Sequence, residues 1–308
     1  MLWEKQGLIY SPPHDNSWRH QNANCPTPLQ LDEKTLRIFC AMCTSENVGR
    51  IGYVDVDIHN PGRILSVSEK PVLDIGRPGS FDDNGLVPLS LLVHNGKVYL
   101  YYVGFQLGVK VPYYMFGGLA ISEDGGKSFK KISESPVLDR TDSEIYARCG
   151  MCVIRHENKF KMWYIGSTHE GWTEHKGKKL PLYTMRYIES DDGINWAGSG
   201  VPCMEFASSD EHGFGRPFVW VEDGVYRQYY SIRTYSRGYY IGYAESLNGL
   251  TWERKDSLAG IGNSSSGWDS TAACYTSLFS HGKDTFMFYN GNGMGKTGFG
   301  YAKLYTDV

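Results

Sequence analysis

The chain has 308 residues and a formal net charge of −3, a length that fits one large domain or two small ones. No cluster of Lys and Arg stands out, which argues against nucleic acid as a partner. The 36 glycines, 22 tyrosines and 8 tryptophans, with few amphipathic stretches of helical length, favour an all-β chain with many turns.

The N-terminal residues lack the long apolar segment of a signal peptide, and no stretch of about 18 apolar residues occurs. We therefore expect a cytoplasmic protein without a membrane span. The odd number of cysteines, seven, is consistent with a reducing compartment.

One sequence pattern recurs five times along the chain, at intervals of about 60 residues. Each copy has a polar turn, an apolar strand and a further strand that ends in small residues. The turns occupy residues 32–34, 95–97, 157–159, 222–224 and 281–283. The strands that follow them are expected at 36–41, 98–103, 160–165, 225–231 and 285–290, and the next strands at 51–54, 118–121, 186–189, 241–244 and 299–302.

Three copies continue into a turn of the form Ser-x-Asp/Asn-Gly that ends in an aromatic residue, at 122–129, 190–196 and 246–252. The Asp or Asn is expected to accept hydrogen bonds from amides of its own turn, and Gly supplies a positive φ. The aromatic residue packs the outer strand against its sheet. The pattern resembles the Asp-box turn of sialidase-like propellers, in which its role is structural.

These repeats predict a single domain, residues 1–308, folded as a five-bladed β-propeller with four-stranded antiparallel blades around a central channel. The two ends of the chain must then meet in one blade, because an open sheet edge invites aggregation. Residues 7–10 are predicted to form the outer strand of the last blade. Two long hairpins, at 105–116 and 167–182, are expected to lie beside one another.

In a propeller the first strand of every blade lines the channel, so residues that precede these strands should converge. Four of the five copies carry a carboxylate there, and the residues predicted to be catalytic are Asp82, Asp83, Glu144, Glu211 and Asp269. Crowded carboxylates repel one another, so at least one pKa should be raised, and a protonated acid beside an ionised one suits cleavage of a glycosidic bond. Alternatively, these carboxylates cap loops or pair with nearby arginines and close the channel.

The same mouth of the channel carries side chains suited to sugar. The residues predicted to bind substrate are Arg19, His20, Asn22, Tyr146, Arg148, His212, Arg216, Trp268 and Asn290. Aromatic rings can stack on a sugar ring, Asn and His can bind hydroxyls, and arginines can hold a carboxylate or phosphate. Each such residue alone is more often structural, so this prediction depends on their convergence.

No cofactor is expected, and no metal site is assigned. In a strand, residues three apart point to opposite faces, so the Cys-x-x-Cys pairs are expected to be buried thiols; they are Cys40/Cys43 and Cys149/Cys152. A divalent cation on the channel axis stays open, because oxygen ligands could come from Asp82, Asp83 and Asp269. The glycine-rich segment 290–296 is expected to be a hairpin rather than a phosphate loop, because no helix follows it.

The order of these elements resembles the five-bladed propeller superfamily of furanosidases and related enzymes, which includes arabinanases, xylosidases, invertases, levansucrases and mannoside phosphorylases. Segments 80–85, 267–270 and 289–300 look like motifs of uncharacterised glycosidase-like proteins encoded with bacterial surface-polysaccharide genes. The likeness covers nearly the whole chain and is specific for the subfamily rather than for a reaction.

The resemblance implies three acidic roles. Asp82 or Asp83 would be the base or nucleophile, Glu144 the residue that tunes the pKa, and Glu211 the general acid. The chain departs from the family pattern in its first repeat, which carries Gln21 and Asn22 where the hydrolases have a carboxylate. Either the triad has moved one blade around the ring, or hydrolysis as the family performs it is lost.

The expected function is therefore cleavage or transfer of a glycosidic bond by carboxylate acid/base catalysis, as a glycoside hydrolase-like glycosidase or phosphorylase. The partner would be a carbohydrate or a sugar phosphate. The alternative is a protein of surface-polysaccharide biosynthesis that binds a sugar or sugar nucleotide without hydrolysis, or transfers it. A platform for protein interactions is a third interpretation, which four carboxylates at equivalent positions disfavour.

Overall fold

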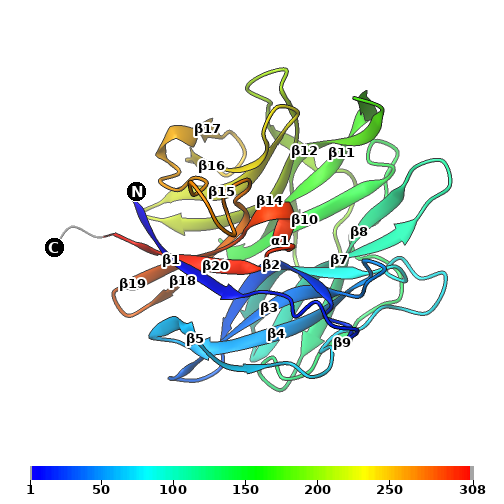
Figure 1. The fold of residues 1–308 in the computed structure, drawn as a ribbon. Coiled ribbons are helices and arrows are strands. Elements are labelled where there is room, and N and C mark those ends of the chain that lie inside the picture. Colours follow the sequence, from blue (N-terminus) through cyan, green and yellow to red (C-terminus); the bar gives the residue numbers. More distant parts are fainter. Residues whose placement is uncertain (1, 306–308) are drawn as a thin grey trace.

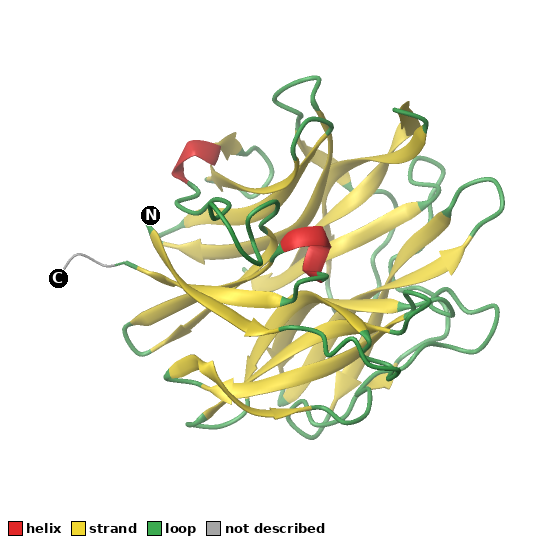
Figure 2. Cartoon of the chain, viewed as in Figure 1, coloured by secondary structure: helices red, strands yellow, loops and turns green. Residues whose placement is uncertain are grey.

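The computed structural model describes residues 2–305, which form an almost entirely β-structure (Figures 1 and 2). Its strands fall into successive groups of four, which we call units 1 to 5. Unit 1 consists of β2 (Gln21–Gln30), β3 (Thr35–Cys43), β4 (Gly49–Asp57) and β5 (Asn60–Val67). Unit 2 consists of β6 (Leu86–His94), β7 (Lys97–Leu107), β8 (Tyr113–Ser122) and β9 (Lys130–Lys131).

The remaining units follow in the same order. Unit 3 consists of β10 (Ala147–His156), β11 (Lys159–His175), β12 (Lys178–Ser190) and β13 (Val201–Met204). Unit 4 consists of β14 (Glu211–Glu222), β15 (Val225–Thr234), β16 (Gly238–Ser246) and β17 (Glu253–Arg254). Unit 5 consists of β18 (Cys274–His281), β19 (Asp284–Asn290), β20 (Phe299–Leu304) and β1 (Trp3–Tyr10).

Within each unit, neighbouring strands pair antiparallel, and the predicted second and third strands lie where the repeats placed them. Units 2 and 3 share one eight-stranded sheet, because a short parallel ladder joins Ala147 and Arg148 of β10 to Met115 and Phe116 of β8. The sheets surround the middle of the molecule, where the short helix α1 (Asn292–Gly295) lies (Figure 1). A single 3-10 turn, η1 (Asp256–Leu258), follows β17.

The predicted outer strand from the N-terminal residues is confirmed. β1 pairs antiparallel with β20 and forms the outer strand of unit 5, so the first and last strands of the chain share a sheet. Trp3 is 5% exposed, and its indole nitrogen donates to the Tyr229 hydroxyl of unit 4 at 2.9 Å. β1 therefore ties unit 5 to its neighbour as well as completing a sheet.

The three Asp-box turns are confirmed. The Oδ1 atoms of Asp124, Asp192 and Asn248 each accept hydrogen bonds from two backbone amides of their own turn, at 2.8 to 3.0 Å. The Ser128 hydroxyl, together with the turn amides, holds the pKa of Asp124 well below the ordinary range for Asp, and the Asn195 and Ile194 amides do the same for Asp192.

Each of these turns also docks the preceding unit. Its glycine carbonyl accepts a hydrogen bond from a side chain on the second strand of that unit. The three pairs are Arg37 with Gly126, Tyr101 with Gly193, and Trp163 with Gly249, at 3.2, 2.8 and 2.7 Å. The same turn therefore closes one unit and joins it to the next.

Every first strand has a register shift at an equivalent place, close to the middle of the molecule. At these irregularities Cys25, Gly150, Arg216 and Tyr275 adopt positive φ values. A bulge changes where side chains point, and bulges are common beside functional sites. All four residues line the same central cavity, described below.

The two long hairpins lie together, as predicted. The ring centroids of Tyr113, at the start of β8, and Trp172, in β11, are 5.8 Å apart. Lys179 donates across to the Lys110 carbonyl at 3.4 Å. No helix within residues 2–305 is long and apolar enough to cross a membrane.

The contribution of β1 to stability can be measured with Trp3→Ala. Because the buried indole leaves a cavity and a lost hydrogen bond, we expect the free energy of unfolding to fall by about 3–5 kcal/mol. Leu8→Ala, on the same strand but 40% exposed, should change it by about 1 kcal/mol or less. Equal losses in chemical denaturation of the two variants would contradict this role of Trp3.

Candidate functional site

A cavity of about 600 Å³ lies where the first strands of the five units meet. This volume falls within the range of about 300–1,000 Å³ typical of small-molecule sites. Side chains from every unit line it, and its polar or aromatic lining includes Asn22, Asn24, Asn47, Asn84, Phe105, Tyr113, Tyr183, Arg216, Arg233, Tyr239, Tyr275 and Lys296. The predicted convergence of distant segments on one mouth therefore occurs.

The glycine-rich segment contributes to this lining. Gly293, Met294 and Lys296 face the cavity from the β19–β20 connection, and α1 lies near the middle of the molecule in Figure 1. Gly293 and Met294 have positive φ values inside this four-residue turn, so it is an irregular hairpin. This agrees with the prediction of a hairpin rather than a phosphate loop.

None of the lining residues is Asp or Glu. The structure instead places four of the five predicted catalytic carboxylates beside cations of their own units. Asp82 is 1% exposed and lies 2.5 Å from Nζ of Lys131 on β9, with the Tyr102 hydroxyl of β7 donating to it at 3.1 Å. Asp83 is half-buried and accepts the Gly79 amide at 2.8 Å, so it caps its own loop.

Unit 3 repeats the arrangement of Asp82. Glu144 is 0% exposed, lies 3.4 and 3.5 Å from the side chains of Arg148 and Arg186, and accepts the Tyr164 hydroxyl at 2.9 Å. Burial is the largest influence on this carboxyl, and it raises the pKa of Glu144 above the ordinary value despite both arginines.

Units 4 and 5 follow the same plan. The Glu211 carboxylate accepts hydrogen bonds from both terminal nitrogens of Arg254 on β17, at 2.7 and 2.8 Å. Asp269 is 2% exposed, lies 2.6 Å from Nζ of Lys5 on β1, and accepts the Tyr289 hydroxyl at 2.9 Å. Burial alone would raise the pKa of Asp269, but the bonds from Lys5, Ser264 and Tyr289 together lower it.

The recurrence of a carboxylate in four repeats thus coincides with a recurrent structural contact. A tyrosine at the same place in the second strand accompanies each one, and the set is Tyr102, Tyr164, Tyr230 and Tyr289. In unit 4 the Tyr230 hydroxyl donates instead to Asp256, which shares Arg254 with Glu211. Unit 1, which lacks the carboxylate, has Cys40 at the tyrosine position. A tyrosine that recurs with the carboxylate is thus a sequence signal for this contact within each unit.

Of the nine residues predicted to bind substrate, Asn22 and Arg216 line the cavity. The Asn22 amide nitrogen donates to Asn47 at 2.9 Å, and its buried Oδ1 has no hydrogen-bond partner among the described residues. Arg216 is 2% exposed, and it donates to carbonyl and hydroxyl oxygens of Leu89, Pro26, Tyr275 and Thr27. Its guanidinium therefore joins units 1, 2, 4 and 5 and has no free donor for a ligand.

The other seven predicted residues do not line this cavity. Five of them make polar contacts elsewhere: Arg19 with the Ser68 carbonyl, His20 with Asp15, Tyr146 with Gly171 and Leu182, Arg148 with Asp139 and Gly198, and Asn290 with Ala23, Cys25 and Gly298. The remaining two stack on tyrosines: His212 on Tyr235 and Trp268 on Tyr289. These seven side chains therefore contact other residues of the protein and not the central cavity.

Sequence reasoning missed the second-strand and third-strand side chains of the cavity. Arg233 near the end of β15, Tyr183 on β12 and Tyr239 on β16 all line it. The alignment of the repeats covered only residues ahead of the first strands, so it held no signal for these three. The guanidinium carbon of Arg233 lies 4.9 Å from the Tyr183 ring centroid and 5.4 Å from that of Tyr239.

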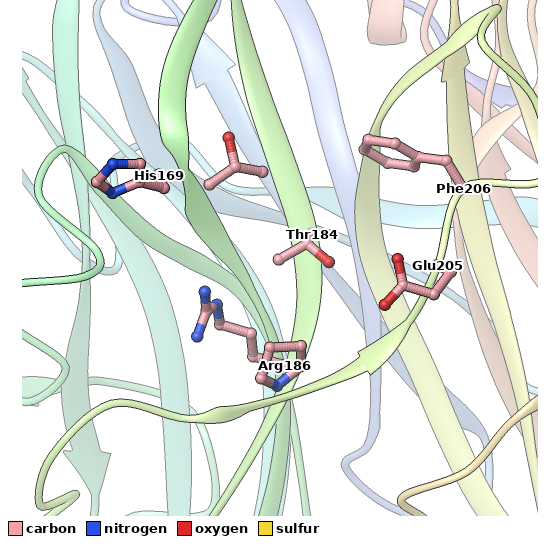
Figure 3. Close-up of a pocket in the computed structure, with 7 residues that line it drawn as sticks. His169, Thr184, Arg186, Glu205 and Phe206 are labelled. Carbon is pink, nitrogen blue, oxygen red and sulfur yellow. The ribbon is translucent and has the colours of Figure 1, made fainter.

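A smaller pocket of about 230 Å³ lies between β12 and the segment after β13 (Figure 3). His169, Thr184, Arg186, Glu205 and Phe206 line it, together with Thr168 and Pro202. Arg186 also contacts Glu144, so this pocket lies next to the buried carboxyl of unit 3. It is separate from the lining of the central cavity, with which it shares no residue.

Within residues 2–305, no three His, Cys, Asp or Glu side chains are grouped so that they could hold a metal ion. Asp82 and Asp269, considered as oxygen ligands, contact lysines of different units. All seven cysteines are buried free thiols, as predicted for the two Cys-x-x-Cys pairs.

No family model matches the chain. It is 34% identical over 304 residues to the uncharacterised protein Rv1502 of Mycobacterium tuberculosis strain H37Rv, with 99% of both chains covered. The uncharacterised protein MT1551 of strain CDC 1551 has the same identity and coverage. The chain belongs to the family of these two proteins.

Members of this Rv1502 family can be expected to share the fold described above, because the alignment spans almost the whole chain. Solved structures show a similar fold. A BT0996 RGII complex has a TM-score of 0.75 at 17% identity, covering 98% of this protein and 92% of that one. A thermostable family-43 glycoside hydrolase has a TM-score of 0.71 at 17% identity, covering 97% and 93%. The protein thus has the β-propeller-like fold of these glycosidases, as the resemblance implied.

The contact between Glu211 and Arg254 can be tested with Glu211→Gln. The substitution leaves the Arg254 side chain, which is 14% exposed, with Asp256 as its only carboxylate among the described residues, so we expect the free energy of unfolding to fall by about 3 kcal/mol. Glu222→Gln, whose carboxylate is 60% exposed beside Arg227, is the control and should change it by about 1 kcal/mol or less. An unchanged unfolding midpoint in Glu211→Gln would contradict a structural role.

The lowered pKa of Asp269 makes a prediction for acid stability. A lowered folded-state pKa contributes stability that is fully present above the ordinary Asp pKa of 3.8 and is lost as pH falls through the folded value. Asp269→Asn should therefore be less stable at neutral pH and lose less further stability below pH about 4. Chemical denaturation from pH 7 to 3 measures this, with Glu33→Gln on an exposed turn as the control.

Proposed function

We propose that the chain, residues 1–308, is one five-bladed β-propeller that binds a carbohydrate in its central cavity. The five units, the closure of unit 5 by β1 and the approach of the five first strands support the ring. The similar solved structures are described as glycoside hydrolases, and one as an RGII complex, which supports a sugar as the ligand.

The observation that carries this proposal is the chemistry of the cavity lining. Tyr113, Tyr183, Tyr239 and Tyr275 offer ring faces and hydroxyls, and asparagine amides of units 1 and 2 line the same cavity. Tyrosine suits the apolar faces of a sugar ring, and amides can donate to and accept from its hydroxyls. The buried Oδ1 atoms of Asn22 and Asn24, which have no partner among residues 2–305, add acceptors that a ligand hydroxyl would satisfy.

The absence of Asp and Glu from this lining favours binding or transfer over hydrolysis by two carboxylates. Glycoside hydrolysis needs an acid and a second carboxylate on either side of one bond. The catalytic roles of Asp82, Asp83, Glu144, Glu211 and Asp269 stay predictions, and the ion pairs of four of them compete with such roles. A place in surface-polysaccharide biosynthesis and a cytoplasmic location belong to this proposal and rest on the sequence alone.

Glycosidase or phosphorylase activity is the second candidate. The raised pKa of Glu144 favours it, because a carboxyl that keeps its proton can serve as a general acid. An activity screen on furanosides and pyranosides, with and without phosphate, separates the candidates. Turnover that Glu211→Gln abolishes without loss of stability would establish the hydrolytic assignment and overturn the binding proposal.

Sugar binding can be tested by calorimetry with neutral and acidic monosaccharides and disaccharides. Tyr239 lines the cavity, whereas the next residue, Tyr240, lies outside its lining and contacts Arg237. We expect Tyr239→Ala to weaken binding by about fivefold or more, and Tyr240→Ala to leave it unchanged. If both variants bind as the native protein does, the ligand lies elsewhere.

A further inference from the structure

Arg233 is a half-buried cation of the central cavity, and no carboxylate of the described residues neutralises its charge. It is absent from the ion pairs of residues 2–305, and its Nε and Nη1 atoms are buried without a hydrogen-bond partner there. A buried guanidinium without a partner is costly, because desolvation is not repaid by donors that find acceptors. Such a group is expected where a ligand completes the site.

Four other arginines of the described residues either face a carboxylate or use all their donors. Arg37, Arg148 and Arg254 lie within 4.0 Å of Asp55, Glu144 and Glu211 respectively. Arg216, which also lines the cavity, has no carboxylate among the described residues but donates five hydrogen bonds to oxygens of other units. A guanidinium has five N–H donors, so Arg216 has none left for a ligand. Arg233 differs from all of them.

The groups that face Arg233 supply no negative charge. Burial raises the pKa of Tyr183, Tyr239 and Tyr275, so these phenols stay neutral. Burial, with a further contribution from Arg233, lowers the pKa of His212 to about 4, so this imidazole is neutral at pH 7. The guanidinium thus keeps its positive charge between the rings of Tyr183 and Tyr239.

We infer that Arg233 binds the oxyanion of an acidic sugar, either the carboxylate of a uronic acid or the phosphate of a sugar phosphate. Guanidinium groups bind both anions through charge-assisted hydrogen bonds. The neighbouring tyrosines would contact the sugar ring while Arg233 fixes its charged end. This inference rests on the proposed binding of carbohydrate in the same cavity and specifies the class of sugar.

The experiment is calorimetry with matched pairs of ligands: glucuronate against glucose, galacturonate against galactose, and glucose 6-phosphate against glucose. We expect an acidic member to bind more tightly than its neutral counterpart. Arg233→Gln should weaken that binding by roughly 10- to 100-fold and weaken the binding of a neutral sugar far less. The uronate and phosphate arms identify the anion, and inorganic phosphate alone shows whether the sugar is needed.

Arg237→Gln is the control, because it removes one positive charge from the exposed end of the same hairpin outside the cavity lining. Arg233→Lys keeps the charge and should retain part of the preference. Arg233→Gln without ligand should unfold at the same temperature as the native protein or higher, since it removes an unpaired buried charge.

The outcomes separate the two proposals. Equal binding of acidic and neutral members, or an acidic preference that survives Arg233→Gln, overturns the inference and leaves sugar binding in place. No binding by any member of the panel overturns both. A preference for an acidic sugar that is lost in Arg233→Gln and kept in Arg237→Gln supports both.

Discussion

The buried guanidinium of Arg216 is the contact on which the centre of the molecule depends. It lies on the first strand of unit 4, and its five donors reach oxygens on the first strands of units 1, 2 and 5. No other side chain could make these five hydrogen bonds, because only arginine has five N–H donors in one plane. Its position at a bulge with a φ of 30° brings it to the axis. Arg216 also lines the central cavity, so this junction forms part of the cavity wall.

Much of this architecture could be predicted from the sequence, because turns and alternating strands are local properties. The five repeats, the Asp-box turns and the closure by residues 7–10 all follow from short segments. The direction of a loop side chain does not follow from a short segment, since a residue ahead of a strand can face the middle of the molecule or its own sheet. Asp82 and Glu211 face lysine and arginine partners on outer strands, and nothing in their spacing revealed this. Arg233 was not among the predicted site residues, because it lies in the second strand of its unit.

The repeated carboxylates make a recurrent contact within the units. In this chain an acidic residue ahead of the first strand joins a tyrosine of the second strand and a cation further out, so it ties the layers of one unit. The central cavity then keeps tyrosines, amides and arginines. The contrast between carboxylates that have cationic partners and a guanidinium that has no carboxylate is the basis of the proposal that the cavity binds an acidic sugar.

The pairing of β1 with β20 has a consequence for biosynthesis. A ribosome makes Trp3 about 300 residues before Leu304, its ladder partner. Until Leu304 has been made, β1 has no strand to pair with, and unit 5 stays incomplete. The nascent polypeptide must keep that segment from pairing with other chains during translation, which makes it a natural client site for chaperones.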